Sequence, residues 1–522
     1  MASNLPPPAP NHTRHTLPPE SELRIEVPIG ITCTVTLRSG GSGSASGGSA
    51  EIFGAEIPPE RPIRLTATKV AIFTWHGCTL DISDEDKLDI VYVSEETDAN
   101  VAYVNTHAQL EAMRDEALAS LLPATNPQQG MLSDNNKHGK DGADSDVEGP
   151  RVLLVGPADC GKSSLARVLS SYAVKLGRTP LLVDLDASQN LLSVPGTMTA
   201  CPVSVDGISA DGNGTASLMM SGGGGGSNNA VMPFVLWYGS QDMNDHPDLY
   251  KAQLEKMGKT IDARLSGDVD ARASGVIVNT YGGMIEDVGY TYLLHAIDAF
   301  RINVVIVLGH DRLYSMLGTH FKKQAQQNED TTTTEAVKVT KQPKLIKLPR
   351  SGGVVSRDAA FRRALRSQCI KRYFYGDAIP PKPTDATTTS TTVTPAQYRF
   401  TPSLIEIPFA DVQLHQLSNI SLSASMLPVS AKQSTDPIQL TTLSASEITP
   451  KLQHAVFAVC HPSAVEKYEQ SGRARDLYLS GVAGFVAVEK VDVNKEMLSL
   501  LSPCAGSLPS QHLLVGDITW VE

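Results

Sequence analysis

The sequence predicts a central α/β domain with a parallel sheet, flanked by an N-terminal β domain and a small C-terminal domain that is β-rich or α+β. Two changes of hydrophobic period along the chain carry this prediction. Apolar and polar residues alternate before residue 122 and after residue 400, as they do in half-buried strands. Between these points, continuous apolar runs alternate with helical patterns, which is typical of parallel sheets.

The expected domain boundaries follow changes in composition. The Pro-rich residues 1–20 bury too little apolar area to become ordered, so we expect a disordered tail there. The N-terminal domain is predicted to span 21–122, and a linker rich in Pro, Asp and Gly to span 123–149. The central domain is predicted over 150–399, with low-complexity insertions, and the C-terminal domain over 400–522.

Composition argues against several classes of protein. The 522 residues carry a formal net charge of −12, which disfavours a general nucleic-acid binder coated with Lys and Arg but permits one basic groove. The chain lacks a run of the roughly eighteen apolar residues that a membrane span needs, so we expect no membrane association. The 7 cysteines form no C-x-x-C pair, so we expect reduced thiols and no structural zinc.

The N-terminal domain is predicted to be a small β-sandwich or barrel. Short alternating runs between turn signals predict strands at 22–27, 32–37, 50–54, 69–75 and 88–93. A helix over 107–122 is expected to follow them. In the C-terminal domain the stretches LIEIPF, HAVFAVC, GVAGFVAVEKVDV and HLLVGDITWV have the same β spacing, without any chemical motif.

In the central domain, buried strands are expected to alternate with helices. Continuous apolar runs predict strands at 151–155, 179–186, 275–280 and 302–309. Apolar residues at i, i+3 and i+4 predict helices at 162–177 and 290–300. Strand–helix–strand units of this kind form right-handed crossovers in a parallel sheet.

The first strand–helix junction contains a phosphate-binding loop. GPADCGKSS (156–164) matches the P-loop pattern G-x-x-x-x-G-K-[ST] between a predicted strand and a predicted helix, which is the context that the pattern requires. Backbone N–H groups of such a loop and the helix N-terminus surround phosphate oxygens. We expect Lys162 to lie against the β- and γ-phosphates and Ser163 to ligate Mg²⁺. The sequence therefore predicts a P-loop NTPase-like central domain that binds a nucleotide.

Acidic residues end the second strand of this domain, in VDLDASQN (183–190). Ligands of parallel sheets bind at this carboxyl edge, and period-two spacing would place Asp184 and Asp186 on one face. Either could orient Mg²⁺ or accept a proton from an attacking hydroxyl, with Gln189 holding a substrate or water. The alternative is a helix N-cap with solvated acids.

A basic segment, LPRSGGVVSRDAAFRRALRSQCIKRYFYG (348–376), follows the last predicted strand. It contains Arg357 and Arg362, and Arg366 is the i+4 neighbour of Arg362 in a predicted helix. On a lid, these arginines could cover a transferring phosphoryl group or grip an RNA backbone. The alternative is a solvated helix face.

Longer stretches of the chain carry a more specific pattern. They include ELRIE (22–26), KVAIFTWHGC (69–78), VNTHAQLEAMR (104–114), GPADCGKSS (156–164), VIVNTYG (276–282) and SGGVVSRDAAFRR (351–363). Together they resemble the Clp-type subunit of the pre-mRNA cleavage and polyadenylation factor, within the eukaryotic polynucleotide 5′-hydroxyl kinase group. The resemblance spans all but the last quarter of the chain, which fits more loosely through SPCAGSLPS and DITWVE.

This resemblance implies the ligand, the site and the partners. The ligand would be ATP, held partly by Glu22 and Lys69 of the N-terminal domain, while the phosphate-loop and strand-end patterns described above give Ser163 and Asp186 as Mg²⁺ ligands. The phosphates would be held by the loop residues Asp159, Cys160, Gly161, Lys162, Ser163 and Ser164. The partners would be a cleavage-factor scaffold protein that binds the C-terminal domain of RNA polymerase II and other mRNA 3′-end processing subunits, in the nucleus, with RNA as a further possible ligand.

Two residues depart from the pattern of active kinases in this group. Those kinases carry the pattern D-x-D-x-G-Q, and this chain has Ser188 at the position of the glycine. Serine resists a positive φ or a close backbone approach. They also carry a Trp after N-T-x-G, a platform for the RNA end, where this chain has Gly283. Base stacking on an aromatic ring contributes roughly 1–3 kcal/mol to RNA binding, and Gly283 cannot provide it. Both departures therefore weaken the case for catalysis.

The sequence leaves two main hypotheses. In the first, the protein is a non-catalytic subunit of the pre-mRNA cleavage factor, required for cleavage during polyadenylation, and ATP is mainly a structural ligand. In the second, it is an RNA 5′-hydroxyl kinase with Asp186, Lys162, Arg357 and Arg362 as catalytic residues. Another P-loop protein such as a GTPase is a third reading, weakened because no N/T-K-x-D base-reading motif is recognisable.

Overall fold

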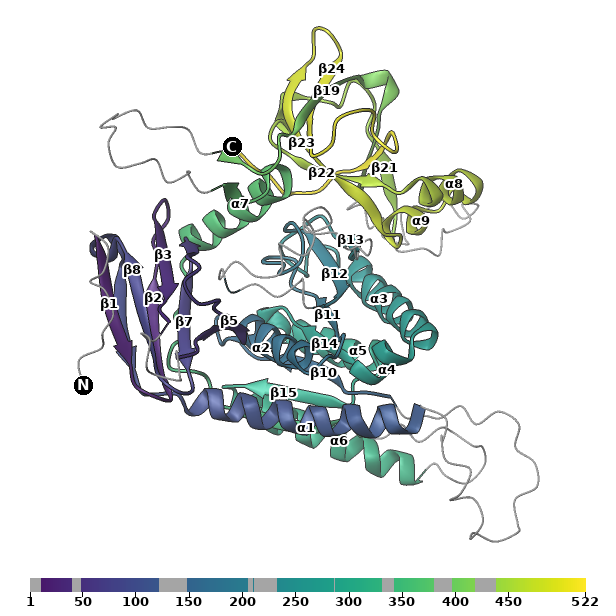
Figure 1. The fold of residues 1–522 in the computed structure, drawn as a ribbon. Coiled ribbons are helices and arrows are strands. Elements are labelled where there is room, and N and C mark those ends of the chain that lie inside the picture. Colours follow the sequence, from purple (N-terminus) through teal and green to yellow (C-terminus); the bar gives the residue numbers. More distant parts are fainter. Residues whose placement is uncertain are drawn as a thin grey trace, which may run out of the picture.

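The computed structural model describes residues 11–39, 48–121, 148–204, 210, 232–285, 287–330, 342–379, 397–417 and 438–522. Nearly all of the linker predicted over 123–149, and most of the low-complexity insertions, lie outside these residues. In Figure 1 the N-terminal strands lie on the left, the C-terminal domain lies at the top, and the central sheet lies between α2 and α3. The predicted arrangement of a central α/β domain flanked by two β-rich domains is confirmed.

The N-terminal domain is a sandwich of two antiparallel sheets, followed by one long helix. One sheet has the strand order β1-β8-β3-β6 and the other has the order β5-β4-β7-β2-β9. Alternating apolar residues of both sheets form their shared core, in which Leu23, Ile72 and Leu80 are fully buried. The elements are β1 (His12–Leu17), β2 (Ser21–Glu26), β3 (Thr32–Leu37), β4 (Glu51–Ile52), β5 (Ala55–Glu56), β6 (Ile63–Thr66), β7 (Lys69–Thr74), β8 (Cys78–Ser83), β9 (Ile90–Ser94) and α1 (Asp98–Leu121).

Strand β1 corrects the prediction of a disordered tail over residues 1–20. It pairs with β8 along its whole length, from His12 opposite Ser83 to Leu17 opposite Cys78. The Arg14 Nε donates to Asp81 Oδ1 at 2.7 Å, and that carboxylate is fully buried. The sequence HTRHTL contains one apolar residue, so its pairing depends on the backbone and on this ion pair, which no hydrophobic pattern reveals.

The central sheet has seven strands in the order β13-β12-β11-β14-β10-β15-β16. Five of them are parallel: β10 (Arg151–Val155), β11 (Leu181–Asp184), β14 (Val276–Asn279) and β15 (Val304–Leu308), as predicted, and β16 (Lys344–Leu348), which was not predicted. The sequence did not predict β12 (Thr197–Pro202) and β13 (Phe234–Trp237), which are antiparallel at one edge. The chain between β11 and β12 contains turns and no helix, so it folds back antiparallel instead of crossing over.

Helices cover both faces of this sheet. They are α2 (Lys162–Lys175), α3 (Pro247–Gly267), α4 (Val269–Ser274), α5 (Asp287–Ala299) and α6 (Asp311–Asp330), whereas α7 (Ala359–Tyr375) lies between the N-terminal strands and the C-terminal domain (Figure 1). Helix α1 of the N-terminal domain runs alongside the central domain and packs on α2 and α4 (Figure 1). Its Arg114 is fully buried and donates through Nε to the carbonyl of Ser274 at 2.9 Å. The N-terminal domain is therefore held against the central domain by a helix.

The C-terminal domain is built on a second seven-stranded sheet, with the order β19-β24-β23-β22-β25-β20-β21. Its core is continuous with that of the central domain: Phe374 of α7 stacks on Trp520, and Trp237 of β13 contacts Phe485. The elements are β17 (Ala378–Ile379), β18 (Gln397–Tyr398), β19 (Ser403–Pro408), β20 (Gln413–Leu417), β21 (Leu440–Thr442), β22 (Val456–Cys460), α8 (Pro462–Ser471), α9 (Ala474–Tyr478), β23 (Val482–Asp492), β24 (Met497–Ser502) and β25 (His512–Leu514).

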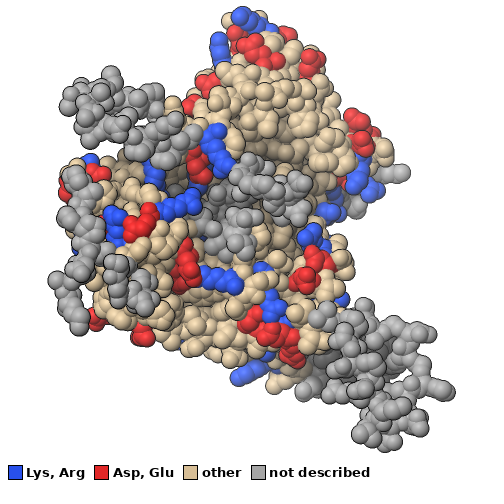
Figure 2. All heavy atoms as spheres, viewed as in Figure 1, with Lys and Arg blue, Asp and Glu red and all other residues tan. Residues whose placement is uncertain are grey.

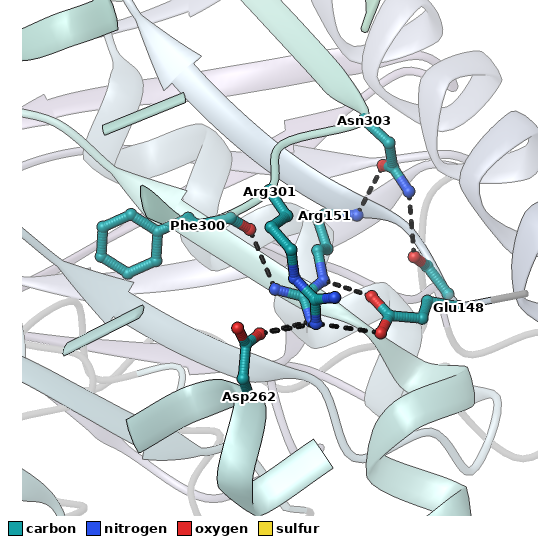
Figure 3. A network of polar contacts seen from close by, with 7 residues as sticks. Glu148, Arg151, Asp262, Phe300, Arg301 and Asn303 are labelled. Atoms are coloured by element: carbon teal, nitrogen blue, oxygen red, sulfur yellow. Dashed lines mark hydrogen bonds and ion pairs between the residues drawn. The ribbon is translucent and has the colours of Figure 1, made fainter. Parts of the chain in front are cut away.

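A polar network closes the amino end of the central sheet (Figure 3). Arg151, at the start of β10, is 1% exposed and donates to Glu148 Oε2 and Asp262 Oδ1, both at 2.7 Å, and to the carbonyl of Phe300 at 2.9 Å. Its backbone N–H donates to Asn303 Oδ1 at 2.7 Å. The network ties three segments of the central domain together at the end opposite the phosphate loop.

Two sequence-based expectations concern the distribution of surface charge and the presence of membrane-spanning helices. On the face shown in Figure 2, Lys and Arg side chains are interspersed with Asp and Glu side chains. In the part of the chain that the structure describes, no helix is both long enough and apolar enough to cross a membrane.

Candidate functional site

A cavity of about 600 Å³ lies where the N-terminal domain, the phosphate loop and the start of α7 meet. All the site residues predicted from the sequence line it: Glu22, Lys69, Asp159, Cys160, Gly161, Lys162, Ser163, Ser164, Asp186, Arg357 and Arg362. They come from four parts of the chain, namely the first sandwich, the phosphate loop, the loop after β11 and the segment leading into α7. The fold therefore gathers the predicted residues around one cavity.

The phosphate loop connects β10 to α2, as predicted. Gly161 precedes the helix with φ of +96°, a left-handed conformation that favours glycine. A Cβ at this position would lie 3.1 Å from Cγ2 of Val354, because the segment before α7 closes over the loop. Lys162 is 6% exposed, and its Nζ donates to the carbonyls of Gly156 at 2.8 Å and Pro157 at 2.7 Å. Burial lowers the pKa of this ammonium group.

Asp159, within the phosphate loop, binds two arginines, Arg357 and Arg362, of the basic segment 348–376, which we call the lid segment. Its carboxylate accepts hydrogen bonds from the backbone N–H of Arg357 at 3.1 Å and from Arg357 Nε at 2.9 Å. It also pairs with Arg362 of α7. Burial alone would raise the pKa of Asp159, but the hydrogen bonds and charges of Arg357 and Arg362 outweigh it and lower the pKa. The lid segment is thus latched to the loop that it covers.

The two acids after β11 occupy different environments. Asp184 is fully buried: Oδ1 accepts from the Asp186 N–H at 3.0 Å, and Oδ2 accepts from the Leu191 N–H at 2.6 Å. Burial, and then the charge of Asp186, raises the pKa of Asp184 to about 7. Only Asp186 lines the cavity. The expectation that both share a face was wrong because β11 ends at Asp184, and the alternation ends with it.

The alternative of a helix N-cap also fails here. Residues 185–196, all of them described, form turns and bends and contain no helix. Ser188 is not among the described residues with positive φ, so position 188 does not require a glycine conformation. Its hydroxyl donates to Asp186 Oδ1 at 2.6 Å, and its N–H donates to the same oxygen at 2.9 Å. Ser188 therefore occupies one oxygen of the acid that faces the cavity.

Gly283 lies under the ring of Tyr281 at the cavity wall. A Cβ at position 283 would lie 2.6 Å from Cε1 of Tyr281, so a larger residue there requires that ring to move. Tyr281 is half-buried and lines the cavity. Its position was not predicted, because in the sequence it was one variable residue of the N-T-x-G pattern.

The N-terminal domain contributes Glu22 and Lys69 to the opposite wall. Glu22 is 3% exposed and accepts from Arg24 Nε at 2.5 Å. Lys69 pairs with Glu26 at 2.8 Å, and its ammonium lies over the ring of Phe361 on α7, 5.4 Å from the centroid. Both residues are thus held by protein contacts at the cavity wall.

A third arginine of the basic segment, Arg366 of α7, also lines the cavity. From the sequence it was counted among the arginines that could form a lid, but it was not included among the predicted site residues. Burial, and then the charges of Arg363 and Arg362, lowers the pKa of Arg366. Its i, i+4 spacing from Arg362 was the available signal. The start of α7 therefore turns a group of cations toward the phosphate loop.

The oxygen donors in this cavity fit Mg²⁺. The Ser163 hydroxyl and the Asp186 carboxylate both line it, next to the loop that would hold phosphates. Mg²⁺ prefers oxygen ligands and is usually held by one or two protein groups together with substrate phosphates and waters. Within the described residues, no cluster of three or more His, Cys, Asp or Glu side chains suits a metal, so a site of this kind would depend on the nucleotide.

Comparisons with known proteins cover nearly the whole chain. Residues 16–117 match the N-terminal β-sandwich domain of polyadenylation factor, residues 156–376 match the P-loop domain of mRNA cleavage and polyadenylation factor CLP1, and residues 400–522 match pre-mRNA cleavage complex II protein Clp1. Among solved structures, the Clp1p chain of a wild-type Clp1p–Pcf11p complex superposes with a TM-score of 0.70 over 98% of both chains. At 23% identity, that likeness concerns the fold.

Similar proteins occur in plants, fungi and animals. The Protein CLP1 homolog of Arabidopsis thaliana is 32% identical, over 96% of this chain and 93% of its own length. The mRNA cleavage and polyadenylation factor clp1 of Aspergillus niger is 31% identical, over 95% and 93%. The polyribonucleotide 5′-hydroxyl-kinase Clp1 of Danio rerio is also 31% identical, over 98% and 94%. With this identity over nearly its whole length, the chain belongs to the Clp1 family of mRNA cleavage and polyadenylation factors.

Proposed function

We propose that this protein is an ATP-binding subunit of a nuclear pre-mRNA cleavage-factor complex, required for the cleavage step of polyadenylation-dependent mRNA 3′-end formation. ATP is held mainly as a structural ligand. The observation that carries this proposal is the latch between Asp159 of the phosphate loop and Arg357 and Arg362 of the lid segment. It closes the cavity over the place where phosphates would lie.

A nucleotide in this cavity would join separate parts of the fold. The N-terminal wall contributes Glu22 and Lys69, and the phosphate loop contributes backbone N–H groups and Lys162. Lys162 Nζ now donates to two carbonyls of its own loop and to Cys160 Sγ at 4.0 Å, so it can turn to phosphate oxygens without breaking an ion pair between described residues. When bound, Mg²⁺ would be held by Ser163 and Asp186 and would neutralise phosphate charge.

Three features favour retention of ATP over its turnover. Arg357 and Arg362 already bind Asp159, so their charges are partly neutralised. The Ser188 hydroxyl donates to one oxygen of Asp186, so that oxygen already has a partner within the protein. Position 283 offers no aromatic platform for an RNA base.

The family also supports the proposed partners. The two similar solved structures are described as a complex of Clp1p with Pcf11p and as an extended interface between these two proteins, with a glycine-to-arginine mutant that loses ATP. We propose an equivalent scaffold partner for this chain, one that binds the C-terminal domain of RNA polymerase II, together with other 3′-end processing subunits. Because the cleavage of pre-mRNA is a nuclear process, we propose a nuclear location for this protein.

A single preparation tests the proposal. The purified protein is incubated with γ-labelled ATP, Mg²⁺ and a short 5′-hydroxyl RNA, and a second aliquot is denatured to identify the nucleotide it releases. We expect near-stoichiometric intact ATP, no label on the RNA, and loss of the bound ATP in Lys162→Ala. Absence of bound nucleotide from the wild-type protein, in the presence of added ATP, would contradict the proposal.

The second candidate function is a polyribonucleotide 5′-hydroxyl kinase. It is favoured because Lys162, Asp186 and both lid arginines line one cavity, and because the zebrafish relative is named as such a kinase. Asp186 would accept the proton of the RNA 5′-hydroxyl. The hydroxyl oxygen would bond to the γ-phosphorus of ATP as the bond from that phosphorus to ADP breaks and ADP leaves. Lys162, Arg357 and Arg362 would stabilise the transferring charge. RNA labelling that Lys162→Ala abolishes would establish this function in place of the first.

A further inference from the structure

Asn279 connects two parts of the proposed ATP site from behind the cavity wall. It ends β14, the strand between β10 and β11, and is fully buried. Its Nδ2 donates to Ser163 Oγ at 3.2 Å and to Asp184 Oδ1 at 3.0 Å. One amide group therefore contacts both the phosphate-loop serine and the acid at the end of the next strand.

Asp184 extends this connection to the loop that carries Asp186. The carboxylate accepts from the Asp186 N–H through Oδ1 and from the Leu191 N–H through Oδ2. A continuous chain of hydrogen bonds thus runs from Ser163 through Asn279 and Asp184 to the backbone of Asp186. Its two ends are the residues whose oxygens would hold Mg²⁺.

The hydrogen bond from Asn279 also decides what the Ser163 hydroxyl can do. A serine hydroxyl has one donor hydrogen and two acceptor lone pairs. Nδ2 uses one lone pair, which leaves the other lone pair for a cation and the hydrogen for a phosphate oxygen. The remaining polar atom of Asn279, Oδ1, is buried with no hydrogen-bond partner among the described residues. Leaving a buried acceptor unpaired costs free energy, and proteins accept that cost mainly where a group has a functional role.

We propose that Asn279 is a positioning residue for the divalent cation that accompanies ATP. It fixes the side-chain rotamer of Ser163 and, through Asp184, the place of the loop bearing Asp186, so that both oxygens face the same point. This inference rests on the proposed ATP-binding function. Hydrogen-bonding groups behind metal ligands are known to change metal affinity by about 10–100-fold when removed.

The test measures cation binding directly and needs no catalysis. Mn²⁺ replaces Mg²⁺, and electron paramagnetic resonance of free Mn²⁺ gives its affinity for the protein–ATP complex. Asn279→Leu keeps the number and branching of the side-chain heavy atoms and removes the amide group that donates to Ser163 and Asp184. We expect about tenfold weaker Mn²⁺ binding in the ATP complex, with ATP affinity in EDTA unchanged.

A matched control lies at the other end of the sheet. Asn303 likewise uses its side chain to hold neighbouring strands, accepting from the Arg151 N–H at 2.7 Å and donating to the carbonyl of Gly149 at 3.2 Å (Figure 3). Asn303→Leu should lower thermal stability and leave Mn²⁺ affinity at the wild-type value. Equal losses of Mn²⁺ affinity in both variants would overturn the inference, because they would show a general loss of rigidity.

A double-mutant cycle separates positioning from packing. Ser163→Ala should weaken Mn²⁺ binding, and adding Asn279→Leu to it should cause a smaller loss than Asn279→Leu causes in the wild-type protein, because only the route through Asp184 then remains. Additive losses would overturn the inference. If Asn279→Leu does not fold, Asn279→Ala takes its place in both measurements. Wild-type Mn²⁺ affinity in the Asn279 variant would overturn the inference and leave ATP binding intact, whereas failure of the wild-type protein to bind ATP would overturn both proposals.

Discussion

The two ends of the central sheet differ in how their charged groups are paired. At the amino end, Arg151 donates to two carboxylates and one carbonyl, and its neighbour Asn303 also has both polar groups bonded. At the carboxyl end, Lys162 bonds only within its own loop, to two carbonyls and to Cys160 Sγ, and Asn279 keeps an unpaired buried oxygen. The amino end is organised for stability, and the carboxyl end retains polar groups that a ligand can satisfy.

The largest expected effect concerns Lys162 at the carboxyl end. Charge-assisted hydrogen bonds contribute about 1.5–3 kcal/mol, so Lys162→Ala should weaken ATP binding by about a hundredfold. Without nucleotide, its thermal stability should equal or exceed that of the wild type, because burial of the ammonium group is unfavourable. Calorimetric titration and thermal unfolding measure the two quantities. A large loss of stability in the free variant would contradict the contrast between the two ends.

The second expected effect concerns Arg151 at the amino end, where a substitution should change stability and leave ATP binding unchanged. Arg151→Met removes one partner from Glu148 and Asp262, which are partly exposed, so we expect a loss of about 2 kcal/mol in the free energy of unfolding. ATP affinity should stay at the wild-type value because the cavity lies at the other end. Denaturant unfolding and ATP titration on the same preparation provide the comparison. A loss of ATP affinity equal to that of Lys162→Ala would remove the distinction between the ends.

Gly161 tests whether closure of the lid segment depends on the phosphate loop. Alanine at φ of +96° is strained by about 1–2 kcal/mol, and its Cβ would press on Val354 at 3.1 Å. We expect about tenfold weaker ATP binding and faster ATP release, measured by stopped-flow chase with unlabelled ATP. Gly177→Ala, at another positive φ but with nothing within 4 Å of its Cβ, is the control and should affect stability alone.

The smallest effect concerns pH and Asp184. Its pKa is raised to about 7 in the folded protein but is about 4 in an unfolded chain, so the folded state binds more protons between these values. This group therefore lowers the free energy of unfolding as the pH rises through that window, by at most about 1.4 kcal/mol per pH unit. Asp184→Asn removes the dependence, so the variant should gain stability relative to the wild type from pH 6 to pH 7. A constant difference would mean that Asp184 does not titrate there.

Much of the fold was predictable because its signals are local. Apolar runs predicted four of the five parallel strands, and the loop GPADCGKSS predicted a phosphate site within a few residues. The polar strand β1 and the short antiparallel strands β12 and β13 had no such signal. In the site, the residue types were predicted but the bonds between them were not. Asp159 and Arg357 lie 198 residues apart, and only the folded chain brings them together.

Asp184 shows where local periodicity fails. Two acids spaced by two residues predict a shared face only while the strand continues, and β11 stops at the first of them. The buried acid then serves the backbone of its own loop, and the second acid turns to the cavity. Tyr281 and Gly283 are similar, since their mutual packing depends on a turn that the sequence pattern does not define.

Helix α7 connects the cavity to the C-terminal domain. Its 17 residues make a rod about 25 Å long, with Arg362 near the cavity and Phe374 stacked on Trp520 of the C-terminal domain. A small rotation of the first turn of this rod moves its other end by a proportionally larger distance. The first turn of α7 and the stack of Phe374 on Trp520 belong to one helix, so a displacement at the cavity end of α7 is also a displacement at the C-terminal domain.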